Sequence, residues 1–527
     1  MIKKSALSLL VLCYCLATSA QTTTVKGIVI DSISQIPLPY VAVFFGNTTT
    51  GTLSDNAGRF SISIPQDNSP TREIIVALSD YKLLKIRVAG GKTSALTVQL
   101  QPFDRQGSIS PPDERWEGNP VYDLLYKAAK ITADDYIPIG NPQTNLFDFG
   151  RVQTAASYNY IEGLRLRGGL ASTSRLHQHL FLSGYAAYGF LDRKPKYHGE
   201  AIWAFNKPKY HEGEFPANNL RLIHEYDIYS LGEIHPHSQN DKLLYSFRRA
   251  RGSLAYRRFS EINYEKESYS GFSYLVWANL RKLTPAGRLS FADNETGDIS
   301  NNLNITETGF RLRYSPEEAF RQNRRKKKLL SVESPIFEFA YSLGLKNVLG
   351  GEYSYHRTEF SVQKRFPLGD FGYIDTSAEM QHIWTKVPFP LLLFPNANSS
   401  YLIENDSFSM LTAMEFINDS QYTVKATYEA DKLLLTRIPY LEDLMLHEVF
   451  SIRGVYGQLS DKNNPALSGG LFEFPHSSRL MSHEPYWEGG IGVANIGGVL
   501  RIDYVFRLSY RNEKGAAKNG FRVGVSL

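Results

Sequence analysis

Cysteine is nearly missing from the chain. Its two cysteines, Cys13 and Cys15, both lie within the first 20 of 527 residues. Beyond residue 20 the sequence therefore excludes a disulfide framework, a thiolate metal site and a cysteine nucleophile. Whatever stabilises the rest of the chain has to come from other side chains.

Long hydrophobic runs and strong net charge are missing as well. After residue 20 no uninterrupted apolar run reaches the roughly 18–20 residues of a transmembrane helix, and mean hydropathy is −0.29. The formal net charge of +5 is too slight to indicate nucleic acid as a partner. Aromatic residues make up 13% of the chain, which argues against disorder. Forty glycines and 25 prolines favour many turns between short strands.

The N-terminus has the pattern of a secretory signal peptide over residues 1–20. Lys3 and Lys4 form a basic region, residues 5–17 are apolar, and Thr18-Ser19-Ala20 supplies small residues for cleavage. A lipoprotein signal is the alternative, but the bulky Leu12 and Tyr14 precede the two cysteines. We expect an exported protein, and loss of the two lysines lowers the formal charge to +3.

Residues 21–101 are expected to form a β-sandwich, because short β-branched segments alternate with closely spaced turn signals. The pattern G-x-V-x-D, P-L-P and S-D-x-x-G-x-F resembles the carboxypeptidase regulatory-like domain, a transthyretin-like sandwich common at the front of Bacteroidetes outer-membrane proteins. The residues that carry the resemblance are Gly27, Asp31, Pro37, Asp55, Gly58 and Phe60. The resemblance concerns the fold and does not imply peptidase activity.

Residues 102–149 are expected to form a linker with a short amphipathic helix. A Ser/Pro-rich stretch at 108–113 is typical of linkers. Asn119 can cap a helix that has Pro120 at its first position. Val121, Leu124, Leu125 and Ala128 then share one helical face, which either packs on its own domain or binds a partner.

From about residue 150 to 527 the hydrophobic period becomes two. In residues 500–511 one parity reads Leu, Ile, Tyr, Phe, Leu, Tyr and the other reads Arg, Asp, Val, Arg, Ser, Arg. Successive residues of a strand face opposite sides, so such a strand has one apolar face and one charged face.

A soluble sandwich also shows this alternation. These strands, however, are many and long, and aromatic residues are frequent on their apolar face, as in the aromatic girdles at membrane interfaces. We therefore predict an all-β chain with a transmembrane antiparallel β-barrel of about 16 strands, give or take two, whose closure leaves no edge in lipid. A soluble all-β assembly is the alternative.

The C-terminal region is also similar to a family of uncharacterised Bacteroidetes surface barrels. The segments that carry the resemblance are 459–463, 485–496, 500–504, Asn119-Pro120 and 159–167. It resembles more weakly the sixteen-stranded barrels of the outer-membrane insertase superfamily, where Arg453-Gly454 would correspond to an Arg-Gly pair in a lumenal loop. The last residue, Leu527, stands where assembly machinery usually reads an aromatic residue.

Candidate sites are few. Asp31, Asp55 and Asn56 are either calcium ligands or turn residues. We expect His177 and His179 on the same face of a strand and His235 and His237 in a connecting segment; either pair could bind metal, or they are ordinary lumen and loop histidines. The basic residues Arg321 and 324–328 form either a solvated loop or a contact with lipopolysaccharide. No G-x-S-x-G elbow supports a hydrolase. We predict no catalytic, cofactor or metal residue.

The leading functional hypothesis is a non-enzymatic outer-membrane barrel with its N-terminal domain in the periplasm, serving transport, envelope assembly or surface attachment. Expected partners are outer-membrane lipid and lipopolysaccharide, the barrel assembly machinery and a periplasmic protein that docks on the sandwich. The alternatives are an energy-coupled receptor, which needs a plug and about 22 strands, a barrel-borne hydrolase and a soluble adhesin.

Overall fold

A computed structural model describes most of the chain, and contacts divide it into two compact units. Unit 1 contains residues 1–111, 317–323 and 327–331, and unit 2 contains the rest. The described residues are 22–32, 35–38, 41–45, 51–55, 57–65, 71–78, 81, 84–101, 135–141, 144–232, 254–268, 270–316, 319–322, 327–331, 334–398, 400–430, 433, 435–438, 446–496 and 500–525. The predicted signal peptide, the helix after Asn119, His235 and His237 lie outside them.

Unit 1 contains two small sheets that share an apolar core. The core includes Val29, Phe45, Phe60, Ile74 and Val98, which are at most 5% exposed. One sheet contains β4 (Arg59–Pro65), β1 (Thr22–Asp31) and β7 (Thr93–Leu100), and the other contains β3 (Gly51–Leu53), β2 (Ala42–Phe45), β5 (Thr71–Ala77) and β6 (Leu84–Ala89). A two-stranded ladder of β18 (Ala319–Gln322) and β19 (Lys327–Ser331) belongs to the same unit.

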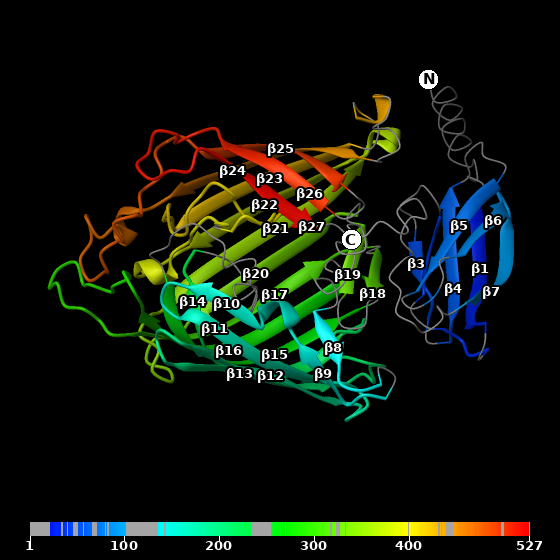
Figure 1. Cartoon of the computed structure of the whole chain (residues 1–527), viewed down its shortest axis with the longest axis horizontal. Coiled ribbons are helices and arrows are strands. Elements are labelled where there is room, and N and C mark those ends of the chain that lie inside the picture. Colours follow the sequence, from blue (N-terminus) through cyan, green and yellow to red (C-terminus); the bar gives the residue numbers. More distant parts are fainter. Residues whose placement is uncertain are drawn as a thin grey trace, which may run out of the picture. The chain divides into compact units, whose positions relative to one another are not determined.

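Unit 2 is dominated by one sheet of 18 strands that curve around a common interior (Figure 1). The long strands that neighbour each other along the chain pair antiparallel, and most neighbours in the sheet are also neighbours in the sequence. The strands are β8 (Tyr136–Pro138), β9 (Phe147–Gly150), β10 (Ala156–Asn159), β11 (Gly163–Ser172), β12 (Leu180–Gly189), β13 (Pro195–Ala204), β14 (Asn218–Ser230), β15 (Leu254–Glu267), β16 (Phe272–Pro285), β17 (Leu303–Tyr314), β20 (Ile336–Gly344), β21 (Tyr355–Pro367), β22 (Tyr373–Ile383), β23 (Ser420–Ala430), β24 (His447–Gln458), β25 (Tyr486–Ile496), β26 (Leu500–Arg507) and β27 (Asn519–Val525).

The first and last long strands, β11 and β27, do not pair directly with each other in the described residues. In the strand order the hairpin β8–β9 stands between them, and β9 pairs with β11 at Leu170–Ser172. The long strands therefore do not close the sheet by themselves. The edge of β27 is also bonded from within: Val523 N–H donates to Tyr401 O (2.9 Å) and Ile403 N–H donates to Val523 O (2.9 Å).

The two ends of the large sheet differ in their connections. At one end, which we call the long-loop end, the strands are connected by residues 190–194, 231–253, 286–302, 345–354, 384–419, 459–485 and 508–518. At the other, which we call the short-turn end, they are connected by residues 173–179, 205–217, 268–271, 315–335, 368–372, 431–446 and 497–499, which are shorter on average. Short 3₁₀ turns, such as Phe389–Leu391 and Asp461–Asn463, occur in the loops. In the described part of the chain no helix is both long and apolar enough to cross a bilayer.

The predicted fold class is confirmed: the chain is all-β, with sandwich-like strands followed by a large antiparallel sheet. The 18 strands fall within the expected range of about 16, give or take two. One boundary needs correction, because β8 and β9 lie inside the expected linker of residues 102–149. Strands of three or four residues are too short to show a period of two, so the sequence could not indicate them.

Candidate functional site in the charged interior

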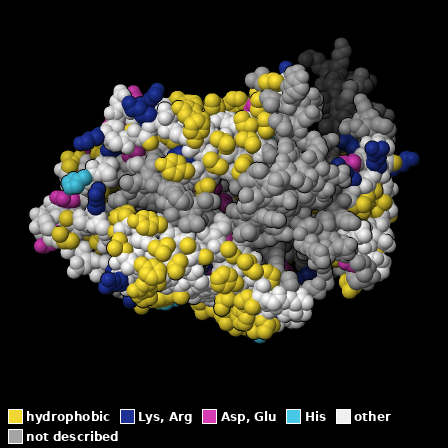
Figure 2. All heavy atoms as spheres, viewed as in Figure 1, with side chains coloured by type: hydrophobic (Ala, Val, Ile, Leu, Met, Phe, Trp, Pro, Cys, Tyr) yellow, Lys and Arg dark blue, Asp and Glu magenta, His cyan; other side chains and the backbone are white. Residues whose placement is uncertain are grey.

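The large sheet buries charge and exposes hydrocarbon. In β26, Arg501, Asp503 and Arg507 are at most 9% exposed, whereas Ile502 is 39% exposed. Figure 2 shows many hydrophobic side chains on the described surface of the strands. This pattern reverses that of a water-soluble sheet, whose apolar face is buried. The charged parity predicted from the sequence thus lines the interior.

A dense ion-pair network occupies the interior beside β11–β14. The Arg165 guanidinium binds Asp227 through two bonds of 2.6 and 2.7 Å, and Tyr185 also donates to that carboxylate. Lys196 lies 2.6 Å from both Glu162 and Asp192. Bidentate geometry and full pairing are what allow charges to remain buried. The bonds to Asp227 therefore join β11 and β12 to β14 across the interior, beyond the neighbouring strand.

The network continues across β13–β15. His198 Nδ1 lies 3.0 Å from Glu225, Arg257 donates to the same carboxylate at 2.6 Å, and Arg221 pairs with Glu200 at 2.9 Å. Each of these side chains belongs to the inward parity of its strand. The interior therefore contains both signs of charge in alternation rather than a field of one sign.

Segment 384–419, the connection between β22 and β23, folds against the inner face of the sheet. The Glu488 carboxylate accepts hydrogen bonds from the backbone N–H groups of Ser409 (2.8 Å) and Met410 (2.9 Å). Arg453 donates to Ser407 O at 2.7 Å, and Arg522 donates to Ser409 O. Inward charges on three strands thus serve as anchors for a loop, which we call the inner loop.

A buried ion pair fixes the end of the inner loop. Arg507, fully buried on β26, donates to Glu415 Oε1 at 2.7 Å, and Glu415 is 3% exposed. The aromatic ring of Phe416 packs next to it against Tyr486 and Tyr510, with centroid distances of 6.1 and 5.0 Å. The loop is therefore held by charge and by apolar contact together.

An apolar core made mostly by loops and strand ends fills the long-loop end. Phe291 stacks on Phe472 at 5.3 Å and meets the edge of Phe389 at 5.9 Å, so three different connections contribute one ring each. In the first of them, the Asp293 carboxylate accepts backbone hydrogen bonds from Thr296 and Glu295 (both 2.9 Å), and these bonds lower the pKa of Asp293. The long-loop end is a packed structure rather than a set of loose loops.

The described histidine candidates, His177 and His179, do not form a metal site. His177 and His179 lie in the turn before β12, not on a strand as the sequence suggested, and both rings contact Trp203 at 5.9 and 5.7 Å. His177 Nδ1 accepts the backbone N–H groups of His179 and Leu180. Within the described residues no group of three or more metal-ligating side chains comes together.

Two His-x-x-Glu pairs, His211/Glu214 and His356/Glu359, are present in the sequence, and neither has the setting of a zinc site. Glu214 accepts the backbone N–H groups of Lys209 and Tyr210, both at 2.6 Å, and so shapes a turn. His356 and Glu359 lie three apart on β21, which places them on opposite faces. The His-x-x-Glu motif is therefore present in the sequence without a zinc site. For the pair on β21, a spacing of three residues along a strand cannot bring two ligands together.

Asp55, Asp31 and Arg453 have structural contacts, whereas Asn56 and residues 324–326 lie outside the described residues. Asp55 Oδ1 accepts the N–H groups of Ala57 and Arg59, and Gly58 has φ +72°, as a tight turn requires. Asp31 accepts a bond from the Tyr81 hydroxyl at 2.5 Å. Arg453 lies on β24 and not in a loop, so the expected match to a lumenal-loop Arg-Gly pair is wrong in position.

Two serine–histidine contacts bear on the hydrolase alternative. Ser260 Oγ lies 2.8 Å from His224 Nδ1, and Ser420 Oγ lies 2.6 Å from His382 Nδ1. The second ring nitrogen of His224 contacts the Tyr197 hydroxyl at 3.3 Å rather than a carboxylate. His224 is on the outward, exposed parity of β14. This geometry differs from a triad, in which an acid orients the imidazole.

Comparison with known protein families identifies the family of the chain. Residues 139–463, more than half of its length, match the C-terminal domain of a family of unknown function, DUF5686. The chain belongs to this family. Residues 25–106 match a CarboxypepD_reg-like domain, which confirms the predicted resemblance of the N-terminal unit.

The solved structures that match this DUF5686 protein are distant from it in sequence. BamA from Haemophilus ducreyi lacking POTRA domains 1–3 is 10% identical over 73% of this chain and 70% of its own, with a TM-score of 0.44. A putative membrane-associated protein of unknown function from Bacteroides fragilis NCTC 9343 is 14% identical over 55% of this chain and 94% of its own, with a TM-score of 0.13. No curated protein matches the sequence.

Proposed function

We propose that the protein is a non-enzymatic outer-membrane β-barrel protein whose interior is a conduit for polar solutes, kept shut by its own inner loop. The observation that carries the location is the reversed burial of the large sheet, with buried charge and exposed Leu, Phe and Tyr side chains. An apolar exterior of this kind is stable in hydrocarbon and not in water.

The orientation follows from the connections. Bacterial barrels have short periplasmic turns and long extracellular loops. We therefore assign the short-turn end to the periplasm, together with the N-terminal sandwich, and the long-loop end to the cell surface. Outer-membrane lipid, lipopolysaccharide, the barrel assembly machinery and a periplasmic protein on the sandwich are the partners that this arrangement implies.

Three tests of location act on the full chain. The protein should fractionate with outer membranes, and its unheated form should migrate differently from its heated form on a denaturing gel. Protease added to intact cells should cut connections of the long-loop end and leave the sandwich whole. Recovery of the protein in the soluble periplasmic fraction would contradict the proposed membrane location.

The conduit part rests on the anchors of the inner loop. Glu488 and Arg453 hold backbone groups of residues 407–410, so passage requires that these bonds break. In planar bilayers the unmodified protein should conduct rarely. Glu488→Ala should open it more often, whereas Glu473→Ala, at an exposed loop carboxylate of the same end, should not.

Replacement of residues 396–412 by a short Gly/Ser linker should give steady conductance. A variant that keeps its heat-modifiable migration yet does not conduct after this replacement would contradict the conduit.

Surface attachment is a second candidate function. Ile299, Leu349 and Leu467 are 66%, 79% and 66% exposed at the long-loop end, where water would surround them in the proposed orientation. Serine replacement of these three residues should reduce attachment of cells without altering conductance.

A further inference from the structure

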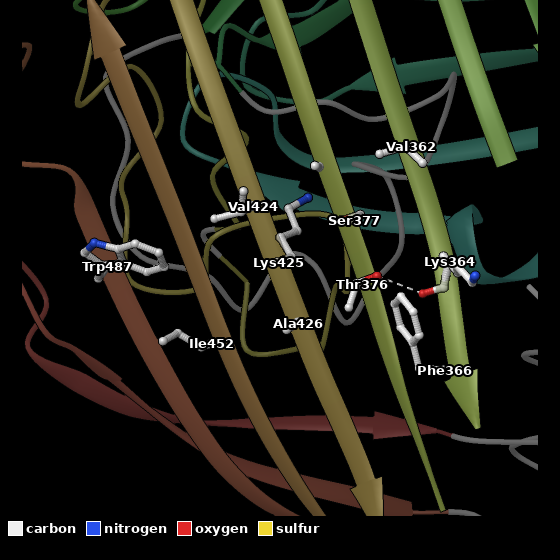
Figure 3. Close-up of a pocket in the computed structure, with 11 residues that line it drawn as sticks. Val362, Lys364, Phe366, Thr376, Ser377, Val424, Lys425, Ala426, Ile452 and Trp487 are labelled. Carbon is white, nitrogen blue, oxygen red and sulfur yellow. Dashed lines mark hydrogen bonds between the residues drawn. The ribbon is translucent and has the colours of Figure 1, made fainter. Parts of the chain in front are cut away.

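A groove crosses the outward face of the large sheet. It has a volume of about 530 Å³ and extends from β21 to β25. Figure 3 shows Lys364 and Phe366 at one side of it, Trp487 at the other, and Thr376 and Ala426 between them. All of the residues that line the groove belong to unit 2.

The strand register explains why the wall is hollow there. Lys364, Thr376, Ala426 and Ile452 are cross-strand neighbours in one outward row, and two members of this row are small. The adjoining rows carry the larger side chains of Phe366 and Trp487, and small Ala378, in the same row as Trp487, also lines the groove. Rows of this kind run at right angles to the strands, which are tilted in a barrel, so the groove crosses the wall diagonally.

Trp487 keeps its place because its neighbour has no side chain. A Cβ added at Gly454 would lie 2.4 Å from the Trp487 ring. The indole therefore lies flat over Gly454 and forms a ridge along the groove. Replacement of Gly454 would push this ridge out of position.

Lys364 is the single charge in this part of the outer face. The other outward residues of the described segments 360–366, 374–380, 422–428 and 450–454 are uncharged. Within the described residues no carboxylate forms an ion pair with Lys364, and its ammonium lies 5.0 Å from the Phe366 ring. Lys364 stands close to Pro367, where β21 ends at the short-turn end, so its ammonium can reach the level of lipid headgroups.

We propose that this groove is a binding site for one anionic glycerophospholipid, with an acyl chain along Thr376 and Ala426 and the headgroup phosphate on Lys364. The inference rests on the proposed membrane location. An apolar channel that ends at a lone ammonium complements a ligand with a hydrocarbon chain and an anionic head. A zwitterionic lipid offers the same chain with a weaker attraction to the lysine.

The test uses two outward tryptophans as reporters. Trp487 borders the groove, and Trp203, 44% exposed on β13, lies on the wall away from it. Two full-length variants each keep one of these tryptophans and have the other four replaced by phenylalanine. Each is reconstituted in phosphatidylcholine vesicles that contain a minor fraction of lipid brominated on its acyl chains, as phosphatidylglycerol or as phosphatidylcholine.

We expect brominated phosphatidylglycerol to quench Trp487 at about fivefold lower mole fraction than it quenches Trp203, the preference that one surface lysine gives for an anionic lipid. Brominated phosphatidylcholine should quench both tryptophans alike. Lys364→Gln should remove the preference at Trp487, and Ala426→Leu, which fills the groove, should remove it while keeping the lysine.

The outcomes separate this inference from the proposed function. Equal quenching of both tryptophans by both lipids would leave the membrane location intact and overturn the binding site. Quenching of neither tryptophan would overturn the membrane location itself. A preference for phosphatidylglycerol that persists in Lys364→Gln would also overturn the site, because the charge would then lie elsewhere.

Discussion

The N-terminal sandwich and the large sheet use the same alternation in opposite senses. In β4, Phe60, Ile62 and Ile64 are buried and the serines between them are exposed, whereas in β26 the charged residues are buried and Ile502 is exposed. Period alone fixes which residues share a face, and the surrounding solvent decides which face turns inward. Substitutions of the same kind should therefore have different consequences in the two regions.

The largest effect is expected where a buried ion pair is broken. Arg507→Leu leaves Glu415 buried without its partner, and such a loss costs about 3–5 kcal/mol. The free energy of unfolding in detergent, followed by heat-modifiable migration, measures it. The double variant Arg507→Leu/Glu415→Leu should recover much of the loss. A single variant as stable as the unmodified protein would show that the pair does not hold the inner loop.

Next in size is a cavity in the core of the sandwich. Ile62 is 4% exposed, so Ile62→Ala removes buried hydrocarbon at a cost of about 2–5 kcal/mol. The matched change in the large sheet is Ile502→Ala, which should cost much less because detergent or lipid replaces the lost contacts. Urea unfolding, followed by limited proteolysis of each unit, measures the loss of unfolding free energy in both variants. Equal losses would contradict the contrast between the two regions.

A charge on the outer wall should cost somewhat less. Ile452→Arg places a cation on the outward face of β24, and the penalty for arginine there is about 2–4 kcal/mol near the bilayer midplane. Ile452→Leu serves as the control. The unfolding free energy in lipid vesicles tests this prediction, and an unchanged value would mean that this face does not meet hydrocarbon.

The smallest effect is expected at an exposed ion pair of the sandwich. Lys85 and Glu73 lie 3.6 Å apart with side chains 58% and 37% exposed. Water and salt weaken such a pair, so Lys85→Ala should change stability by about 0–1 kcal/mol. Urea unfolding followed by limited proteolysis measures this change. A loss of unfolding free energy as large as that expected for Arg507→Leu would show that burial does not strengthen a charge pair in this protein.

The sequence predicted the parts of the molecule that repeat. The alternation in residues 500–511 placed Arg501, Asp503 and Arg507 on one face correctly, and the turn at Asp55–Gly58 was readable from its residue types. The inner loop was not predictable, because Glu415 has no periodic neighbours and meets Arg507 across 92 positions. His177 and His179 were predicted on a strand because two residues at i and i+2 share a face of a strand. The same spacing also occurs in turns, so it could not distinguish the two.

The hydrogen bonds between Val523 and residues 401 and 403 make the inner loop and the last strand depend on each other. During synthesis the loop emerges more than a hundred residues before the strand that completes its bonding. Until β27 arrives, the backbone groups of Tyr401 and Ile403 have to find other partners. Truncation of the chain before Asn519 should therefore disturb the interior and not only the margin of the sheet.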